Sequence, residues 1–358
     1  MDTAMKWDDL TRELELGEFP DKQDEVIVWG AGLMGQLEVP LLKETLHIAA
    51  FCDNSEGKQA VDILGLPCIS QEQILAYNRP FVLVSTIKNY SAIKPYLVRM
   101  GVRHCTVDAY VFHQHMEKFY QVYCDLDTHS QEIFAEILRC RLTGDTKHIY
   151  RICSDDQYFA LPQFRFCNED EVFVDCGAFV GDIVEKFLEN NLGVFRKIYA
   201  FEPNRPAFEA MKRRIRGLSD IWLFQEEQIV CEQKGVGKER RQTSFYSTAM
   251  NAANCSIQEN AAAQDTIDLI SLDQYFDDRS EREVTFLKAD IEGFEWDMLL
   301  GARQIIQRNK PKLAISIYHN IFDFFRIHQY LKELVPEYTF AVRHHWNSFN
   351  ETILYCYT

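Results

Sequence analysis

The chain has 358 residues, which is long for one core and comfortable for two domains, and 47% of them are hydrophobic, as expected of a folded globular protein. Its formal net charge of −16 argues against a nucleic-acid backbone as a partner, because two polyanions repel each other. No apolar run approaches the roughly 20 residues that span a bilayer, so we expect no membrane insertion.

The cysteines and the N-terminus point to the cytoplasm. The eleven cysteines are scattered, odd in number and without a C-x-x-C pair, which argues against a disulfide framework and a thiolate zinc site. The first twenty residues are acidic and lack the apolar core of a secretory signal. We therefore expect a cytoplasmic protein with reduced, mostly buried thiols.

After an N-terminal helical segment (1–24), residues 25–110 form the first predicted α/β unit. Four short apolar runs, "EVIVWG", "HIAAFCDN", "PFVLVST" and "RHCTVDA", read as strands, and the first is followed by a helical stretch to about Leu46. Strands that alternate with helices predict a parallel sheet, here a small Rossmann-like domain.

A glycine-rich turn, "GAGLMG", follows the first strand of this unit. Gly30, Gly32 and Gly35 precede a helix and Asp53 closes the next strand, the context of a dinucleotide-binding fingerprint. Pro40 would kink the helix, and no second nucleotide-binding half follows. Three readings stay open: a turn that only packs a helix on a sheet, a site for a nucleotide or nucleotide-sugar, and a working NAD site.

Residues 111–165 carry no strand pattern and are predicted to be a helical connector. The stretch "HSQEIFAEILRCRL" has its apolar residues at helical spacing, with Ser130 as a candidate N-cap and Gly144 just past the end. Near its end, Tyr158 and Phe159 either close over a bound cofactor or anchor the two domains together.

Residues 166–358 read as a second α/β unit. A polar piece from Val230 to Ala263 suits an inserted hairpin or long loop. The predicted strands are Val172–Asp175, Lys197–Phe201, Ile221–Phe224, Thr285–Ala289, Lys312–Ile317, Tyr338–Arg343 and Thr352–Tyr357.

The second unit opens on another glycine turn, "VFVDCGAFVGD". An acid ends the strand, two glycines frame the turn, and Glu202 ends the next strand. This spacing suits S-adenosylmethionine (SAM), whose ammonium and sulfonium favour carboxylates and whose ribose diol suits a bidentate acceptor such as Glu202. The alternative is a helix N-terminal acid and a solvated strand-end glutamate. The predicted cofactor-binding residues are Asp175, Gly177, Ala178, Gly181, Asp182, Glu202, Pro203, Asp290 and Tyr158.

Candidate catalytic residues lie where later strands end, since ligands of open α/β sheets bind at the carboxyl edge. His319 is the first candidate for a general base because it titrates nearest neutral pH, and Asp290 would orient it, contact the cofactor amine or act itself. A histidine bonded only to backbone is equally open. Glu292, His344 and His345 are predicted substrate contacts, although both histidines could be solvated rim residues. A rival arrangement places a divalent metal on Asp290, Glu292 and His319, but we predict no metal site.

Four ordered stretches, "VFVDCGAFVGD", "IYAFEPN", "FLKADIEGFEWDMLLGA" and "PKLAISIYHNIFDF", resemble the FkbM family of SAM-dependent methyltransferases. The resemblance covers roughly Leu126 to Tyr357. It implies a class I methyltransferase sheet of seven strands, the last antiparallel, with SAM over the carboxyl ends of the first strands. It also implies methylation of hydroxyl groups on sugars, polyketides and related small molecules. Residues 25–110 resemble the small nucleotide-binding-like domain that some members carry in front.

We therefore predict an α/β protein with two Rossmann-like domains joined by a helical connector. Its predicted activity is SAM-dependent methyl transfer to a hydroxyl of a small molecule, with sugars and nucleotide-sugars as candidate acceptors, by a chain that could form a homo-oligomer. Two alternatives remain: a nicotinamide-dependent oxidoreductase that uses Gly30, Gly32, Gly35 and Asp53, and a non-catalytic ligand-binding module.

Overall fold

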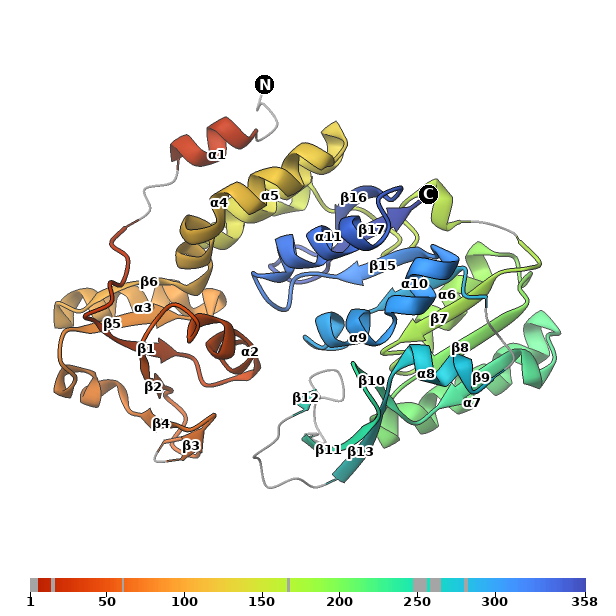
Figure 1. Cartoon of the computed structure of the whole chain (residues 1–358), viewed down its shortest axis with the longest axis horizontal. Coiled ribbons are helices and arrows are strands. Elements are labelled where there is room, and N and C mark those ends of the chain that lie inside the picture. Colours follow the sequence, from red (N-terminus) through yellow and green to blue (C-terminus); the bar gives the residue numbers. More distant parts are fainter. Residues whose placement is uncertain are drawn as a thin grey trace. The chain divides into compact units, whose positions relative to one another are not determined.

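The computed structural model describes residues 6–13, 17–59, 61–165, 168–246, 256–257, 265–279 and 283–358 (Figure 1). The chain forms two compact units, the first made of residues 1–153, 319–325 and 346–350, and the second of residues 154–318, 326–345 and 351–358. Within the described ranges no helix is both long and apolar enough to cross a membrane.

The first unit contains a six-stranded sheet. Its strands are β1 (Glu25–Trp29), β2 (Ile48–Cys52), β3 (Asp62–Ile63), β4 (Leu66–Ile69), β5 (Pro80–Val84) and β6 (Arg103–Thr106), in the order β3-β4-β2-β1-β5-β6. All neighbouring strands are parallel except β3 and β4, which form a short hairpin. The four predicted strands are confirmed as β1, β2, β5 and β6, whereas the β3–β4 hairpin was not predicted.

The first unit also contains helices. They are α1 (Trp7–Glu13), α2 (Leu33–Leu42), α3 (Ile87–Met100), α4 (Val107–Asp125), α5 (Thr128–Thr143) and the 3₁₀ helices η1 (Gln71–Ala76) and η2 (Ile149–Arg151). The predicted N-terminal helix is present as α1, but residues 1–5 and 14–16 of the predicted segment lie outside the described residues. Helix α2 contains Pro40 and ends at Leu42, earlier than predicted.

Helices α4 and α5 occupy residues 111–143 of the predicted connector, which up to residue 153 belongs to the first unit, and one prediction for α5 is wrong. The N-cap of α5 is Asp127, whose Oδ1 accepts a hydrogen bond from the backbone N–H of Ser130 at 2.8 Å, so Ser130 is not the cap. Gly144 ends the helix in the left-handed conformation, φ 74°, as predicted.

The second unit is built on a seven-stranded sheet. Its strands are β7 (Val172–Cys176), β8 (Lys197–Phe201), β9 (Ile229–Glu232), β14 (Phe286–Ala289), β15 (Lys312–Ser316), β16 (Thr339–His344) and β17 (Thr352–Tyr357), in the order β16-β17-β15-β14-β7-β8-β9. Strand β17 runs antiparallel to β15 and β16, and the remaining pairs are parallel. This confirms the predicted seven-stranded sheet with an antiparallel last strand.

The predicted strand Ile221–Phe224 is wrong. Helix α7 (Arg205–Trp222) continues through Ile221 and ends at Leu223, which is left-handed with φ 58°. The side chains of Ile221 and Leu223 are exposed, at 72% and 80%, whereas Phe224 is buried against Phe195. The run therefore lies at a helix end with one side on the core, not in a sheet. The third strand is instead β9, a four-residue run that lies after the 3₁₀ helix η4 (Glu226–Gln228).

The polar piece after β9 contributes an inserted sheet of β10 (Gly235–Val236), β11 (Arg241–Tyr246), β12 (Ser256–Ile257) and β13 (Asp265–Ile270). Strands β11 and β13 pair antiparallel, so the predicted hairpin is confirmed, although residues 247–255 and 258–264 lie outside the described residues. The remaining helices of the second unit are η3 (Pro162–Phe164), α6 (Asp182–Asn190), α8 (Leu272–Asp277), α9 (Glu295–Gly301) and α10 (Arg303–Asn309). Helix α11 (Asp323–Leu334) begins in the first unit and continues in the second.

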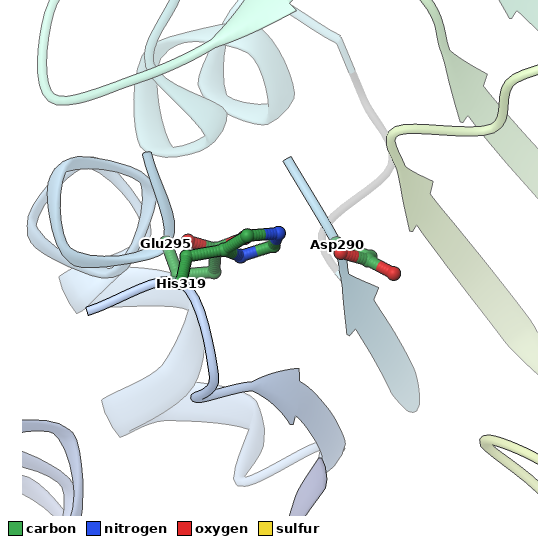
Figure 2. Close-up of side chains that lie close together, drawn as sticks. All are labelled: Asp290, Glu295 and His319. Atoms are coloured by element: carbon green, nitrogen blue, oxygen red, sulfur yellow. The ribbon is translucent and has the colours of Figure 1, made fainter. Parts of the chain in front are cut away.

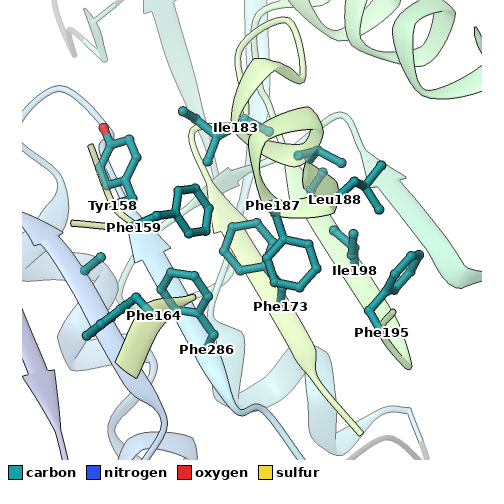
Figure 3. Close-up of a cluster of buried hydrophobic side chains, with 14 of the residues drawn as sticks. Tyr158, Phe159, Phe164, Phe173, Ile183, Phe187, Leu188, Phe195, Ile198 and Phe286 are labelled. Atoms are coloured by element: carbon teal, nitrogen blue, oxygen red, sulfur yellow. The ribbon is translucent and has the colours of Figure 1, made fainter. Parts of the chain in front are cut away.

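Aromatic side chains form much of the core on one face of the seven-stranded sheet (Figure 3). Phe173 of β7 stacks on Phe187 of α6 with ring centroids 4.6 Å apart, and Phe286 of the neighbouring strand lies 4.7 Å from Phe173. All three are fully buried. This packing fixes α6 on the sheet and thereby fixes the turn between β7 and α6, where the candidate site lies.

Candidate functional site

A cavity of about 280 Å³ lies in the second unit at the carboxyl ends of β7, β8 and β14. Its wall is formed by the turn after β7, by the segments Phe201–Pro203 and Lys234–Val236, and by Lys288 and the residues after it. Four residues from elsewhere in the unit complete the wall: Gln157, Tyr158, Tyr318 and Glu351. Of the predicted site residues, the structure brings Tyr158, Gly177, Asp182, Glu202, Pro203, Asp290 and Glu292 into this wall.

The glycine turn is held tightly on two sides. The backbone N–H groups of Gly177 and Ala178 donate to the carbonyl of Phe201 at 3.0 and 2.9 Å. Gly177 has φ 81°, and a Cβ there would lie 2.0 Å from the carbonyl oxygen of Asp290. Gly181, with φ 78°, is the N-cap of α6. Both predicted glycines are therefore required by the turn, but only Gly177 lines the cavity.

Glu202 is aimed by two backbone groups. Its Oε2 accepts from the N–H of Phe179 at 2.8 Å and its Oε1 accepts from the N–H of Asn204 at 2.7 Å. Burial raises the pKa of Glu202 to about 7, although both N–H groups act in the opposite direction. A carboxylate fixed in this way at a cavity wall suits a vicinal diol that can supply further hydrogen bonds.

Asp175 lies below the turn rather than in the cavity. Its side chain is fully buried, and Oδ1 lies 2.9 Å from Nζ of Lys288, the residue opposite it on β14. Lys288 also donates to the carbonyl of Gly177 at 2.8 Å. Burial disfavours the charged form of Lys288, but the carboxylates of Asp175 and Asp290 outweigh it and raise its pKa, so Lys288 is a cation at neutral pH. The direct ligand contact predicted for Asp175 is therefore corrected to an ion pair within the protein.

Asp290 is fixed by two tyrosines. Its Oδ2 accepts from the hydroxyl of Tyr158 at 2.5 Å, and its Oδ1 accepts from the hydroxyl of Tyr318 at 3.2 Å. Burial and the nearby carboxylate raise the pKa of both phenols well above the ordinary value, so both remain donors. Gln157 donates to the Tyr158 hydroxyl at 3.1 Å and also to Glu351.

Backbone strain gathers around the cavity. Four residues of its wall other than glycine have positive φ: Tyr158 (69°), Phe179 (47°), Glu292 (55°) and Glu351 (67°). Such conformations cost on the order of 1–3 kcal/mol each and persist where the surrounding structure holds them, which is most often at functional sites. The strain therefore supports a functional role for this cavity.

His319 lies three residues after β15, at the start of a segment that belongs to the first unit. Its side chain is buried and does not line the cavity. Asp290 and Glu295 of the second unit are drawn in Figure 2; one oxygen of each could ligate a metal ion, and these two atoms lie within 4.8 Å of each other. Sequence reasoning proposed Glu292 for such a group and missed Glu295, which the first turn of α9 brings near Asp290. Glu295 Oε1 accepts from the N–H of Ile291 at 2.8 Å.

The two later histidines do not reach the cavity. His344 is buried, with Nδ1 2.9 Å from Oγ1 of Thr352. His345 lies between the carbonyl of Ser154, 2.8 Å from Nδ1, and the hydroxyl of Tyr355, 3.0 Å from Nε2, and burial lowers its pKa to about 4. Their predicted role as substrate contacts has no support in this geometry.

In the first unit, Asp53 accepts a hydrogen bond from the glycine turn after β1. Its Oδ2 accepts from the N–H of Ala31 at 3.0 Å and from Nζ of Lys58 at 3.1 Å. Gly30 has φ 119°, and a Cβ on Gly35 would lie 2.0 Å from the carbonyl oxygen of Gly30. These contacts account for Gly30, Gly35 and Asp53 without a ligand, and a nucleotide site at Gly30, Gly32, Gly35 and Asp53 remains a prediction.

Sequence reasoning missed several residues of the cavity wall. Lys288 carried a visible signal, because a lysine interrupts the apolar run "TFLKAD" of a strand that is buried on both faces. Phe179, Tyr318 and Glu351 carried none, since only the folded chain brings them to one place.

Two family models match the chain. Residues 175–340 match the methyltransferase FkbM domain, and residues 22–107 match the N-terminal domain of C2185-like proteins. No curated protein matches the chain significantly.

Among solved structures, a methyltransferase FkbM from Methylobacillus flagellatus KT is 22% identical, covers 94% of this chain and 90% of its own, and superposes with a TM-score of 0.56. This match shows the shared fold. An rRNA methylase from Streptococcus thermophilus is 15% identical over 53% of this chain and 87% of its own, with a TM-score of 0.33. A putative methyltransferase from Streptococcus mutans, in complex with SAH, is 13% identical over 59% and 93%, with a TM-score of 0.31. The last two are too distant to bear on the function of this chain.

Proposed function

We propose that this protein is a SAM-dependent O-methyltransferase whose cofactor occupies the cavity of the second unit, since residues 175–340 match the methyltransferase FkbM domain. The observation that carries the proposal is Glu202, whose carboxylate is fixed at the cavity wall by the N–H groups of Phe179 and Asn204. The ribose diol of SAM can donate hydrogen bonds to this carboxylate. Because SAM has no phosphate, the site needs no helix N-terminus that binds one.

The remaining wall suits the rest of this cofactor. Gly177 leaves room for close approach to the backbone, and Asp182, the first residue of α6, offers a carboxylate near the turn. Asp290 supplies a second fixed carboxylate for cationic groups. A bound SAM supplies a methyl group already activated by its sulfonium.

The protein's share of the reaction is positioning and proton removal. Methyl transfer is an in-line displacement, so the cavity must hold an acceptor oxygen about 3 Å from the methyl carbon on the axis of the leaving bond. For proton removal we keep the base predicted from the sequence, His319, which is buried but does not line the cavity. A general base contributes roughly 10²–10⁴-fold. The acceptor is a hydroxylated small molecule, and a sugar or nucleotide-sugar is the first class to try.

The cofactor assignment is tested by calorimetric titration with S-adenosylhomocysteine. We expect one-to-one binding to the parent and an affinity about 10- to 100-fold lower for Glu202→Ala, because two charge-assisted hydrogen bonds to the ribose are lost. Glu227→Ala, at an exposed position of η4, is the control and should bind like the parent.

Equal binding by the parent and Glu202→Ala would remove the cofactor assignment. Once an acceptor is found, His319→Ala should keep S-adenosylhomocysteine binding and lose turnover. Unchanged turnover in that variant would exclude His319 as the base.

A further inference from the structure

A lysine lies at the base of the cavity on a strand that is otherwise apolar. Lys288 of β14 is 2% exposed and still contributes to the cavity wall. In a buried strand, a lysine is favourable only if its ammonium is well paired, because desolvation of an isolated cation costs several kcal/mol. The protein groups that pair with Lys288 therefore determine whether its ammonium can also bind an anionic ligand group.

The ammonium of Lys288 has three hydrogens and two strong protein acceptors. Nζ lies 2.9 Å from Oδ1 of Asp175 and 2.8 Å from the carbonyl oxygen of Gly177. The carbonyl of Cys176 is 3.3 Å away, a long hydrogen bond that a better acceptor can replace. A ligand carboxylate in the cavity would be such an acceptor.

An anion follows two residues later on the same strand edge. The parallel ladder extends past β14, since the N–H of Asp290 donates to the carbonyl of Cys176 at 3.1 Å. Lys288 and Asp290 both line the cavity, so a fixed cation and a fixed anion lie side by side there. The α-amino-acid group of SAM carries the complementary pair of charges, a carboxylate and an ammonium.

The other cation among the described wall residues is Lys234. Its Nζ lies 2.7 Å from Glu232, and its side chain is 31% exposed, compared with 2% for Lys288. A carboxylate bound at Lys234 would compete with Glu232 and water, whereas one bound at Lys288 would lie in a drier part of the cavity. The buried lysine is the stronger candidate.

We propose that Lys288 and Asp290 recognise the amino-acid tail of the cofactor, with Lys288 binding its carboxylate and Asp290 its ammonium. This inference rests on the proposed function. Lys288 then has two roles: its ammonium compensates the buried Asp175 beneath the glycine turn, and it makes the cavity selective for nucleosides that carry a complete amino acid.

The test compares three ligands that differ only in the tail. These are S-adenosylhomocysteine, its decarboxylated analogue, which keeps the ammonium, and 5′-methylthioadenosine, which has neither charge. Calorimetry on the parent should show S-adenosylhomocysteine binding about 10- to 100-fold more tightly than the decarboxylated analogue, as expected for one buried charge-assisted contact. In Lys288→Met this ratio should fall to near one.

The ratio of the two affinities shows whether Lys288 binds the ligand carboxylate or only stabilises the glycine turn. If Lys288 only supports the turn, Lys288→Met weakens both ligands equally and the ratio stays at its parental value, which overturns the inference. Lys234→Met is the matched control and should keep the parental ratio. Asp290→Asn should weaken both ammonium-bearing ligands and leave 5′-methylthioadenosine unchanged.

Folding of the single variant is a separate question, because Lys288→Met leaves Asp175 buried and unpaired. The double variant Lys288→Met with Asp175→Asn removes both charges and should show the same ratio near one. If the parent binds S-adenosylhomocysteine and its decarboxylated analogue equally, this inference fails while the proposed function stands. If the parent binds none of the three, both fail.

Discussion

The protonation of Glu202 links the site to pH at the scale of one residue. Burial raises the pKa of this carboxyl to about 7, so the free protein is partly protonated there at neutral pH. A ribose diol donates hydrogen bonds and therefore binds the carboxylate form. Ligand binding must then expel a proton below pH 7.

We expect the affinity for S-adenosylhomocysteine to rise by up to about tenfold per pH unit as the pH increases from 5.5 towards 7, and to level off above that. Calorimetric dissociation constants across this range check the expectation. Glu202→Gln cannot titrate and should have a flat profile, whereas Glu227→Gln should follow the parent. A parental affinity that does not change with pH would contradict the assigned contact.

Single residues also show where sequence reasoning reached its limit. Glu202, Asp290 and Gly177 were predictable, because each follows a strand whose pattern is plain in the sequence and the carboxyl edge of such a sheet is where ligands bind. Asp175 occupies the expected position in the chain, but its partner Lys288 lies 113 residues later on a neighbouring strand. Strand pattern alone cannot say that two residues lie opposite each other, so a ligand contact and an internal ion pair look the same in sequence.

At the scale of elements, the turn between β7 and α6 depends on a residue without a side chain. Gly177→Ala would place a Cβ 2.0 Å from the carbonyl oxygen of Asp290, in a backbone conformation of φ 81°. The conformation alone costs about 1–2 kcal/mol, and the overlap forces the turn and β14 apart. The prediction is a loss of S-adenosylhomocysteine affinity of at least about tenfold and a lower melting temperature.

Gly144→Ala is the matched control for this variant. Gly144 has a similar φ of 74° but no heavy atom within 4 Å of the added Cβ. It should lower the melting temperature only through backbone strain and leave the affinity unchanged. An affinity of Gly177→Ala equal to that of the parent would show that the turn is not part of the binding site.

Most elements of the second unit could be predicted, and the exception is instructive. Six of the seven predicted strands of the large sheet are present within a residue or two of their predicted bounds, because buried parallel strands are short apolar runs. The run Ile221–Phe224 has the same composition but belongs to the end of α7 and the residues after it. Composition does not show whether a short apolar run lies in a buried strand or at the end of a helix, because that depends on tertiary packing.

At the scale of the molecule, the cavity belongs to the second unit alone, because every residue of its wall does. Hydrogen–deuterium exchange should therefore locate the ligand. At 100 times the dissociation constant of S-adenosylhomocysteine, exchange that requires opening of the site should slow by up to about 100-fold in the turn after β7 and the segment after β14.

Residues 25–110 should exchange at the same rate with and without S-adenosylhomocysteine. Protection at Gly30–Gly35 would instead mean that the first glycine turn binds this ligand. A parallel run with NADH addresses the oxidoreductase alternative, since protection of that turn by NADH would support it.

The path of the chain has a consequence for the gene. The first unit takes residues 319–325 and 346–350 from the last tenth or so of the chain, between segments of the second unit. A stop codon after residue 318 would thus delete part of both units. Recombination at residue 153 would separate the main part of the first unit from its two late segments, which would go with the second unit. Replacement of residues 1–153 by those of a related gene would have to match residues 319–325 and 346–350 as well. We therefore expect the coding sequences of the two units to be inherited together.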